Sequence, residues 1–205
     1  MSADTTATNR NADSLEGDPR VWVFGYGSLI WKTDFPYLER RPAHIHGWTR
    51  RFWQGSHDHR GTPTSPGRVV TLIRETDAVC AGMAFLVTPD VFAHLDHREK
   101  NGYLRVGVAL CFENGGRAEG IVYIADGDNA AFLGAATESE IAAQIARSSG
   151  PSGSNRDYLL LLARALREIG AVDPHVFAIE RALLAMPTGQ RAGDVDLSSA
   201  QSSHH

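Results

Sequence analysis

The 205-residue chain has few cysteines and no long apolar run. Its two cysteines, Cys80 and Cys111, are too few for a disulfide framework or a four-cysteine zinc site. Both lie in apolar, strand-like runs, which favours buried, unreactive thiols in a reducing compartment. No window approaches about 18 consecutive apolar residues, so we expect no membrane span. The acidic, polar N-terminal stretch has no apolar core of a signal peptide, and we expect a cytoplasmic protein.

The chain also has little excess charge of either sign. Lys plus Arg number 20 against 24 Asp plus Glu, which gives a net charge of −4. This balance does not support general affinity for nucleic acid or an anionic membrane. The 42% hydrophobic and 21% charged content is that of one ordinary globular domain. We expect this domain over residues 20–187, between disordered polar tails at 1–19 and 188–205, and a monomer as the default state.

Strand-like runs fill the first half of the chain and helical patterns fill the second. Thr137 and Glu140 form a predicted capping box, Gly150-Pro151 is expected to end that helix, and Asp173-Pro174 opens the last one. The absence of βαβ alternation predicts an α+β fold, most economically a small mixed or antiparallel β-barrel with flanking helices. Strands are predicted at 21–26, 43–54, 68–74, 79–87, 103–113 and 119–125, and helices from Thr88-Pro89, at 137–147, at 157–169 and from Asp173.

A glycine loop follows the first predicted strand. After the apolar run 21–24 the chain reads Gly25-Tyr26-Gly27-Ser28-Leu29. A dinucleotide fingerprint would need glycine at position 30, and a P-loop would need Gly-Lys followed by Ser or Thr. A nucleophile elbow centred on Ser28 would need glycine in place of Tyr26, so Ser28 is not expected to be a nucleophile. Two interpretations stay open: a strand ended by a tight turn, or backbone N–H donors that hold a carbonyl oxygen as it gains negative charge.

One carboxylate, Glu99, has an unfavourable predicted position. It joins the helix that follows Pro89 to the strand at Tyr103, so it falls near the negative end of the helix dipole. Partial burial there would favour its protonated form and suit it to proton transfer. The alternative is a surface carboxylate paired with a neighbouring Arg or Lys. Asp96 is either a second member of the site or a polar residue of the last helical turn.

An arginine-rich stretch lies between residues 40 and 68. Arginine suits bidentate contacts with carboxylate or phosphate groups. The interleaved aromatics Trp48, Phe52 and Trp53 would also fit single-stranded nucleic acid. Because the whole chain is acidic and has no recognised nucleic-acid motif, we prefer a cleft for a small polyanion and expect no nucleic-acid partner.

The same stretch contains two His-x-His pairs. They are His44 with His46 and His57 with His59, and on a strand each pair would share one face. No cysteine or carboxylate accompanies them at the sequence spacing of a metal site, so we prefer histidines that form hydrogen bonds and expect no metal.

Several segments resemble, in order from about residue 21 to 185, the ChaC-type γ-glutamylcyclotransferases. The chain differs from short family members by its long N-terminal tail and by Asn101 in the turn after Glu99. The matching segments are residues 23–31, 50–55, 58–61, 66–72, 98–100, 102–103 and 150–153, together with Tyr158.

The resemblance implies a small β-barrel with flanking helices and the conversion of glutathione to 5-oxoproline and Cys-Gly without a cofactor. Glu99 matches the family's catalytic glutamate, and Tyr158 matches a tyrosine near the pocket. Because the substrate's own α-amine attacks its own γ-carbonyl, the reaction needs no nucleophilic Ser or Cys. One or more of Arg50, Arg51 and Arg60 are candidates for binding the substrate's carboxylates. The implied substrate-binding loop is Val23, Phe24, Gly25, Tyr26, Gly27, Ser28 and Leu29.

Two alternatives to a glutathione enzyme remain at this point. The same chemistry could act on other γ-glutamyl amino acids or γ-glutamylamines, since related families share the Tyr-Gly-Ser-Leu element. A non-catalytic module that binds a γ-glutamyl ligand would keep the pocket without turnover.

Overall fold

A computed structural model describes residues 20–98, 103–125 and 129–187. Its centre is a closed barrel with the strand order β1-β3-β2-β4-β5. Neighbouring strands run antiparallel except β1 and β5, which are parallel, so the sheet is mixed. This confirms the α+β barrel expected from the sequence. The strands are β1 (Val21–Gly25), β2 (Glu39–Ser56), β3 (Gly67–Val87), β4 (Tyr103–Phe112) and β5 (Arg117–Ala125).

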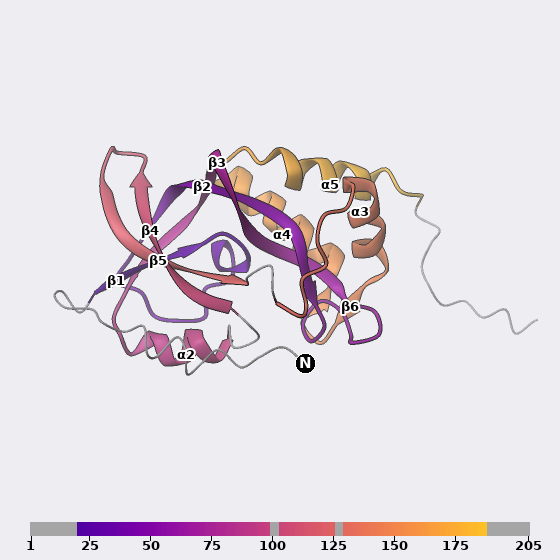
Figure 1. The fold of residues 1–205 in the computed structure, drawn as a ribbon, viewed down its shortest axis with the longest axis horizontal. Coiled ribbons are helices and arrows are strands. Elements are labelled where there is room, and N and C mark those ends of the chain that lie inside the picture. Colours follow the sequence, from indigo (N-terminus) through magenta and orange to yellow (C-terminus); the bar gives the residue numbers. More distant parts are fainter. Residues whose placement is uncertain (1–19, 99–102, 126–128, 188–205) are drawn as a thin grey trace, which may run out of the picture.

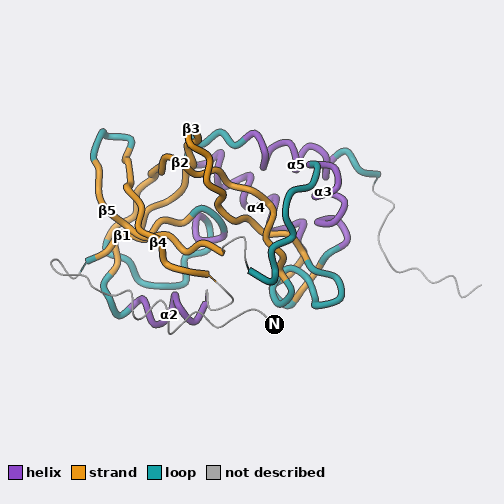
Figure 2. The backbone as a smooth tube through the Cα atoms, in the orientation of Figure 1, coloured by secondary structure: helices purple, strands orange, loops and turns teal. Residues whose placement is uncertain are grey.

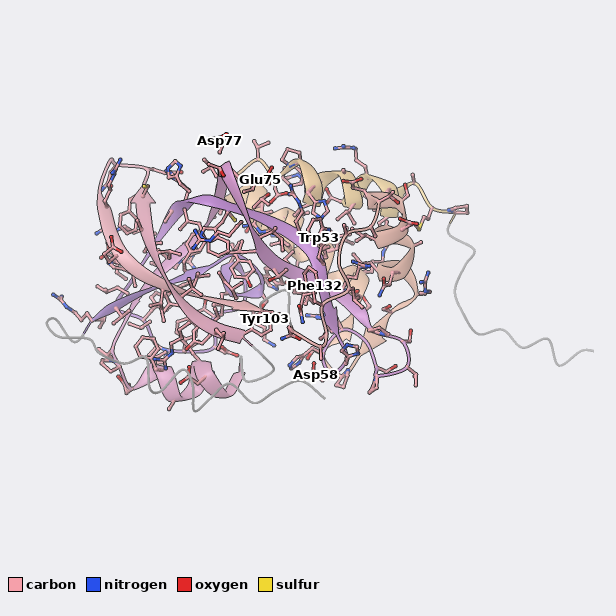
Figure 3. The ribbon with its side chains drawn as sticks, viewed as in Figure 1. Trp53, Asp58, Glu75, Asp77, Tyr103 and Phe132 are labelled. Carbon is pink, nitrogen blue, oxygen red and sulfur yellow. The ribbon has the colours of Figure 1, made fainter. Side chains whose placement is uncertain are left out.

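The long β2 and β3 strands extend beyond the barrel and carry the helices (Figure 1). The sequence predicts two strands where the structure has the single β3 of 21 residues. Trp48 pairs with Arg74 and His46 with Val79, so residues 75–78 bulge opposite Gly47, whose φ is 77°. These polar residues look like a turn in the sequence, but β2 continues as the partner across the bulge. Glu75 and Asp77 lie at this outer bend (Figure 3).

Three helices pack together on the extended part of β2 and β3, and Figure 2 shows them on one side of the strands. The predicted capping box is present, because Thr137 and Glu140 exchange both hydrogen bonds. That helix ends at Arg147, as the predicted range 137–147 has it, and Ser149–Gly150 (β6) then turns back to pair with Gly153–Ser154 (β7). The three helices are α3 (Glu138–Arg147), α4 (Asn155–Glu168) and α5 (Pro174–Leu184).

Asn155 fixes α4 to β3. Its side chain is fully buried, accepts a hydrogen bond from the Arg68 backbone N–H at 2.6 Å and donates to the Arg68 carbonyl at 2.8 Å. Ser154 caps the helix by accepting from the Asp157 N–H. The helix therefore begins two residues earlier than its apolar periodicity predicts, because a buried amide takes the place of an apolar residue.

A fourth helix, α2 (Val91–Arg98), lies against the barrel on the side away from α3, α4 and α5 (Figure 1). The fully buried Phe24, Phe85 and Leu110 belong to the barrel, whereas Leu162 and Ile179 belong to the helical layer. Together these side chains form one continuous core. Among the helices of the described ranges, none is long and apolar enough to cross a membrane.

Candidate active site

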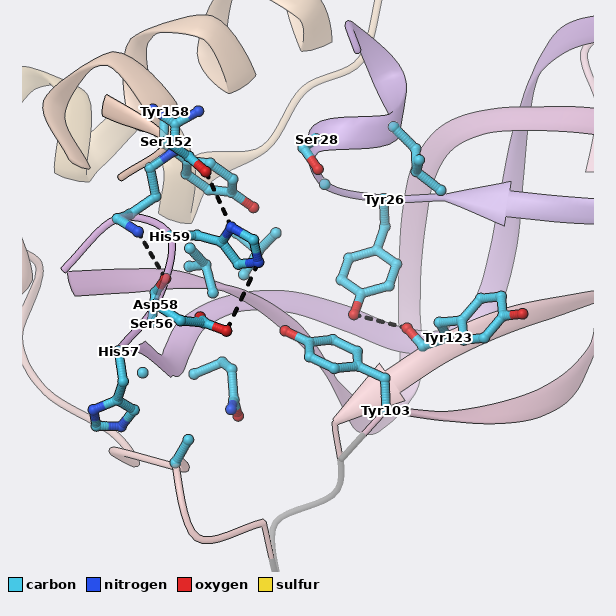
Figure 4. Close-up of a pocket in the computed structure, with 18 of the residues that line it drawn as sticks. Tyr26, Ser28, Ser56, His57, Asp58, His59, Tyr103, Tyr123, Ser152 and Tyr158 are labelled. Carbon is cyan, nitrogen blue, oxygen red and sulfur yellow. Dashed lines mark hydrogen bonds and ion pairs between the residues drawn. The ribbon is translucent and has the colours of Figure 1, made fainter. Parts of the chain in front are cut away.

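A cavity of about 680 Å³ lies where the loop after β1 meets the end of β2 and the start of α4. This volume falls within the range of small-molecule sites, about 300–1,000 Å³. Tyr26, Tyr103 and Tyr123 lie on one side of the cavity, and Tyr158 lies on the other side beside the polar His59 and Ser152 (Figure 4). The cavity therefore combines apolar surface with hydrogen-bonding groups.

The glycine loop forms one wall of this cavity by close packing. Gly27 precedes the short 3-10 helix η1 (Ser28–Ile30). A Cβ added at Gly27 would lie 3.1 Å from Tyr158 Oη, and one at Gly25 would lie 2.7 Å from Leu29 Cβ. Neither glycine has a positive φ. The loop thus needs glycine for space, which brings its backbone against the cavity and against Tyr158.

Tyr26 is held at both its backbone and its hydroxyl group. Its Oη donates to the Tyr123 carbonyl at 2.9 Å, and its own carbonyl accepts from Arg50 Nε at 2.7 Å. Arg50 Nη1 also donates to Asp173 Oδ2 at 2.6 Å, and Nη2 donates to the Ala81 carbonyl. Arg50 is 2% exposed. A buried guanidinium therefore connects the glycine loop, β3 and the start of α5.

Burial of Arg50 favours the neutral guanidine, but the neighbouring Cys80 and Asp173 side chains outweigh this cost and raise the Arg50 pKa above its ordinary value. Arg50 remains charged and serves the loop's architecture. The structure does not bring it to the cavity surface.

A second buried network lies behind the tyrosine wall. The Asp96 carboxylate, 1% exposed, accepts from Arg105 Nη2 at 2.6 Å and from Tyr123 Oη at 2.7 Å. Burial, together with the hydrogen bond to Asp96, raises the pKa of Tyr123 far above its ordinary value. Tyr123 is thus a neutral hydrogen-bond donor. The network joins α2, which carries Asp96, to β4 and β5.

The opposite wall is polar. His59 Nδ1 lies 3.0 Å from Ser152 Oγ, and the His59 ring also faces Asp58, with Nε2 3.8 Å from Oδ2 (Figure 4). Arg60 donates from Nη1 to the Ser154 carbonyl at 3.1 Å, and its guanidinium lies 5.6 Å from the Tyr158 ring centre. A cation on an aromatic face beside a cavity is a suitable partner for a ligand carboxylate.

Gln54 brings a buried acceptor to the cavity. Its side chain lines the cavity, it is 2% exposed, and its Nε2 donates to Asn129 Oδ1 over 3.4 Å. Its Oε1 has no hydrogen-bond partner within the described part of the chain. A buried polar atom without a partner costs free energy, which makes this oxygen a candidate acceptor for a ligand.

Comparisons with known proteins agree with the fold. The sequence model for "ChaC-like protein" matches residues 21–185. The chain belongs to the ChaC-like family. It is 45% identical to the Danio rerio protein named glutathione-specific gamma-glutamylcyclotransferase 1, over 84% of this chain and 93% of that protein. It is 42% identical to Arabidopsis thaliana gamma-glutamylcyclotransferase 2-3, over 88% and 96%. The crystal structure of a yeast gamma-glutamyl cyclotransferase specific to glutathione superposes with a TM-score of 0.75 at 33% identity, covering 82% of this chain and 96% of that one.

In this ChaC-like chain the structure brings most of the sequence-predicted site residues to one cavity. Phe24, Gly25, Tyr26, Gly27, Ser28, Leu29, Arg60 and Tyr158 line it.

Besides Arg50, described above, three other predicted residues are not placed in the cavity. Val23 is fully buried within β1. Arg51 is away from the cavity lining, where Nη2 donates to Glu75 Oε2 at 3.2 Å. Glu99 lies outside the described residues, in the connection between α2 and β4, whose first residue, Tyr103, lines the cavity.

Sequence reasoning missed Gln54 as a site residue and Arg50 as a support for the loop. Gln54 stands in the matching segment 50–55, which was a signal that it could belong to the site. No local signal distinguishes Arg50 from Arg51, because their difference arises from strand alternation: Arg50 points to the interior and Arg51 to the surface.

Proposed function

We propose that this chain is a glutathione-specific γ-glutamylcyclotransferase that converts glutathione to 5-oxoproline and Cys-Gly. The observation that carries the proposal is its identity of 45% with the Danio rerio glutathione-specific gamma-glutamylcyclotransferase 1, over 84% of the chain. Its identity of 42% with Arabidopsis thaliana gamma-glutamylcyclotransferase 2-3, over 88% of the chain, agrees with this. The cavity supports it, since it combines an apolar tyrosine wall with the glycine loop and a cationic side chain, Arg60.

The proposed reaction is intramolecular. The α-amine of the γ-glutamyl group attacks its own γ-carbonyl carbon, a C–N bond of the five-membered lactam forms, and the amide bond to cysteine breaks. No atom enters from water, because the two products together have the composition of glutathione. The enzyme must hold the substrate in a bent conformation that brings amine and carbonyl together, which is a large part of catalysis in such reactions.

Glu99 is the proposed general base and acid. It takes a proton from the α-ammonium group, which frees the lone pair for attack, and returns a proton to the departing amine of Cys-Gly. In sequence Glu99 is four residues before Tyr103, which lines the cavity. The anchoring of α2 to β4 and β5 through Asp96 supports this role, because it fixes the helix from which the Glu99 connection departs.

The remaining contacts follow from the chemistry of the cavity wall. Backbone N–H groups of the loop 26–29 are the proposed donors to the γ-carbonyl oxygen as it becomes an oxyanion. Gln54 Oε1 is the proposed acceptor for a substrate N–H group, and Arg60 the proposed partner of a substrate carboxylate. Arg51, paired with Glu75, is a weaker candidate for that role than the sequence implies.

We further propose that glutathione is the small-molecule partner, that the chain acts as a monomer and that it works in the cytoplasm. Both cysteines are free thiols in the structure, which agrees with a reducing compartment. Sedimentation equilibrium at micromolar protein gives the oligomeric state directly.

The experiment that tests the activity incubates the purified chain with millimolar glutathione and a metal chelator and follows 5-oxoproline and Cys-Gly by mass spectrometry. We expect both products in equal amounts from wild type. Loss of general acid–base catalysis in Glu99→Gln should lower kcat by at least about 10²–10⁴-fold. Glutathione binding, measured by calorimetry, should persist in this variant.

Three outcomes would contradict parts of the proposal. Near-normal turnover by Glu99→Gln would remove Glu99 from its role. Equal turnover of γ-Glu-Ala would favour the broader γ-glutamyl substrate class. A folded wild type that binds glutathione but forms no product from either compound would be a binding module.

A further inference from the structure

Three metal-ligating side chains meet on the barrel wall, apart from the cavity described above. They are His44 and His46 of β2 and Cys111 of β4. One ligand atom from each lies within 4.8 Å of the other two. The proposed glutathione chemistry does not use any of them, and none lines that cavity.

The backbone explains why they converge. His44 and His46 are two residues apart on one strand and therefore share a face. Their rings lie 5.2 Å apart between centres at an interplanar angle of 74°. His44 is the register partner of Cys111 in the antiparallel β2–β4 pair, and directly opposed residues share a face too. The three ligands thus project from the same face of two paired strands.

The cluster is accessible to an ion from solvent. His46 is exposed, and His44 and Cys111 are half-buried. A second cavity, of about 250 Å³, opens between β2 and β4 beside them and is lined by both His46 and Cys111. This leaves room for an ion that keeps one water molecule.

We propose that His44, His46 and Cys111 bind one Zn²⁺ ion, with water as the fourth ligand. Imidazole nitrogen and thiolate sulfur are the ligands that Zn²⁺ prefers, at about 2.0–2.1 Å and 2.3 Å. Tetrahedral geometry with these bond lengths puts ligand atoms roughly 3.3–3.6 Å apart. The ligand atoms now lie within 4.8 Å of one another, so the proposal requires the three side chains to rotate toward a common centre.

The neighbouring charges influence the affinity of the site for Zn²⁺. Arg117 is the register partner of Cys111 on β5, and both Arg74 and Arg117 line the second cavity. Arg74 is already stacked on Trp48, 3.8 Å from the ring centre. The cation at Arg117 opposes the ion, and the Cys111 thiolate offsets part of that repulsion. Arg117→Gln should therefore tighten Zn²⁺ binding by about 2- to 5-fold, the scale of an exposed charge pair.

Binding at this place would stabilise the barrel at one of its two shortest strand pairings, the other being β1–β5. The β2–β4 register contains two residue pairs, Ala43–Phe112 and His44–Cys111, whereas β4–β5 contains nine. An ion held by both strands links them where the ladder is short. With free Zn²⁺ at about 100 times Kd, we expect Tm to rise by roughly 5–10 °C.

The test titrates the full-length, metal-stripped protein with Zn²⁺ against a chromophoric chelator and records the absorption spectrum of the Co²⁺-substituted form. We expect one ion per chain and, with Co²⁺, a thiolate charge-transfer band with intense tetrahedral d–d bands. Cys111→Ser and His46→Ala should each lose at least about 10-fold in Zn²⁺ affinity, and Cys111→Ser should lose the charge-transfer band.

The matched control is the double variant His57→Ala/His59→Ala, which removes the other His-x-His pair and should leave Zn²⁺ affinity unchanged. Retention of full affinity by Cys111→Ser, or a Co²⁺ spectrum of weak octahedral bands without a sulfur band, would overturn the proposal. Loss of Zn²⁺ binding only in His204→Ala/His205→Ala, which replaces the last two residues of the sequence, would also overturn it. Circular dichroism of each metal-free variant separates loss of ligands from loss of fold, and none of these readouts depends on turnover of glutathione.

Discussion

Arg50 shows how one buried side chain can connect several elements of the fold. Its guanidinium donates to the Tyr26 carbonyl in the glycine loop, to the Ala81 carbonyl in β3 and to Asp173 at the start of α5. Asp173 in turn caps α5 by accepting from the Val176 N–H at 3.0 Å. The position of the loop at the cavity therefore depends on an ion pair that lies behind it.

Removing the Asp173 carboxylate from its ion pair with Arg50 should destabilise the fold. We expect Asp173→Ala to lower the free energy of unfolding by about 3–5 kcal/mol, because it leaves a buried guanidinium unpaired. The control is Ser154→Ala, which removes a helix cap without a buried charge and should cost about 1 kcal/mol. Urea unfolding of both variants measures the difference, and equal losses would show that Asp173 acts only as a cap.

We expect replacement of Gln54 to affect stability and function in opposite directions. In Gln54→Leu the buried Oε1, which has no partner among the described residues, disappears. The free energy of unfolding should therefore be unchanged or rise by about 1 kcal/mol, while KM for glutathione rises because the substrate loses an acceptor.

Gln144→Leu is the matched control for Gln54→Leu. Gln144 accepts from Arg68 at 2.7 Å and donates to the Pro66 carbonyl at 2.9 Å, so its replacement should reduce stability. Thermal unfolding and steady-state kinetics on both variants separate the two cases. A large loss of stability with unchanged KM in Gln54→Leu would exclude it from substrate binding.

At the scale of elements, the helical layer meets β2 through a histidine that stays neutral. His175 of α5 accepts the Phe52 N–H at its Nε2, 3.1 Å away, and its Nδ1 lies 3.5 Å from a Glu138 carboxylate oxygen. Burial first, and then the nearby Arg51 charge, lower the pKa of His175 below 6.5. The contact between α5 and β2 thus depends on the unprotonated ring.

This gives a pH dependence of stability with a defined sign. Below about pH 6.5 the unfolded chain binds a proton at His175 that the folded chain does not, so the free energy of unfolding falls as pH falls. We expect His175→Gln to reduce this slope, which is at most about 1.4 kcal/mol per pH unit for one group. Urea unfolding between pH 7.5 and 5.5 measures it.

The sequence predicts elements well where the signal is local. The capping box at Thr137 and the Asp173-Pro174 helix start follow from short-range hydrogen bonds, and the structure has both. The sequence is a poor predictor of features that depend on a strand distant in the chain. The continuity of β3 through residues 75–78 is set by its partner β2, and the approach of Cys111 to His44 is set by the β2–β4 register. Likewise, the glycine loop was identifiable, but its packing against Tyr158 needs the fold.

At the scale of the whole molecule, the core is continuous from β1 to α5. Val21 near one end and Leu183 near the other are both buried in it. We therefore expect a chain shortened to residues 20–187 to keep its free energy of unfolding within about 0.5 kcal/mol and its kcat/KM for glutathione unchanged. Urea unfolding and the product assay on both lengths test this. A loss of more than about 2 kcal/mol would show that the terminal segments belong to the folded unit.

The parallel pairing of β1 with β5 has a consequence for biosynthesis. Trp22 pairs with Gly120 and Val23 with Ile121, about 100 residues later in the chain, so this contact carries a high loop-closure cost. At about 5–20 residues per second, the ribosome needs roughly 5–20 s to make the intervening chain. During that interval β1 can pair with β3 but has one open edge. The barrel, and with it the wall that carries the glycine loop, closes only after most of the protein has been translated.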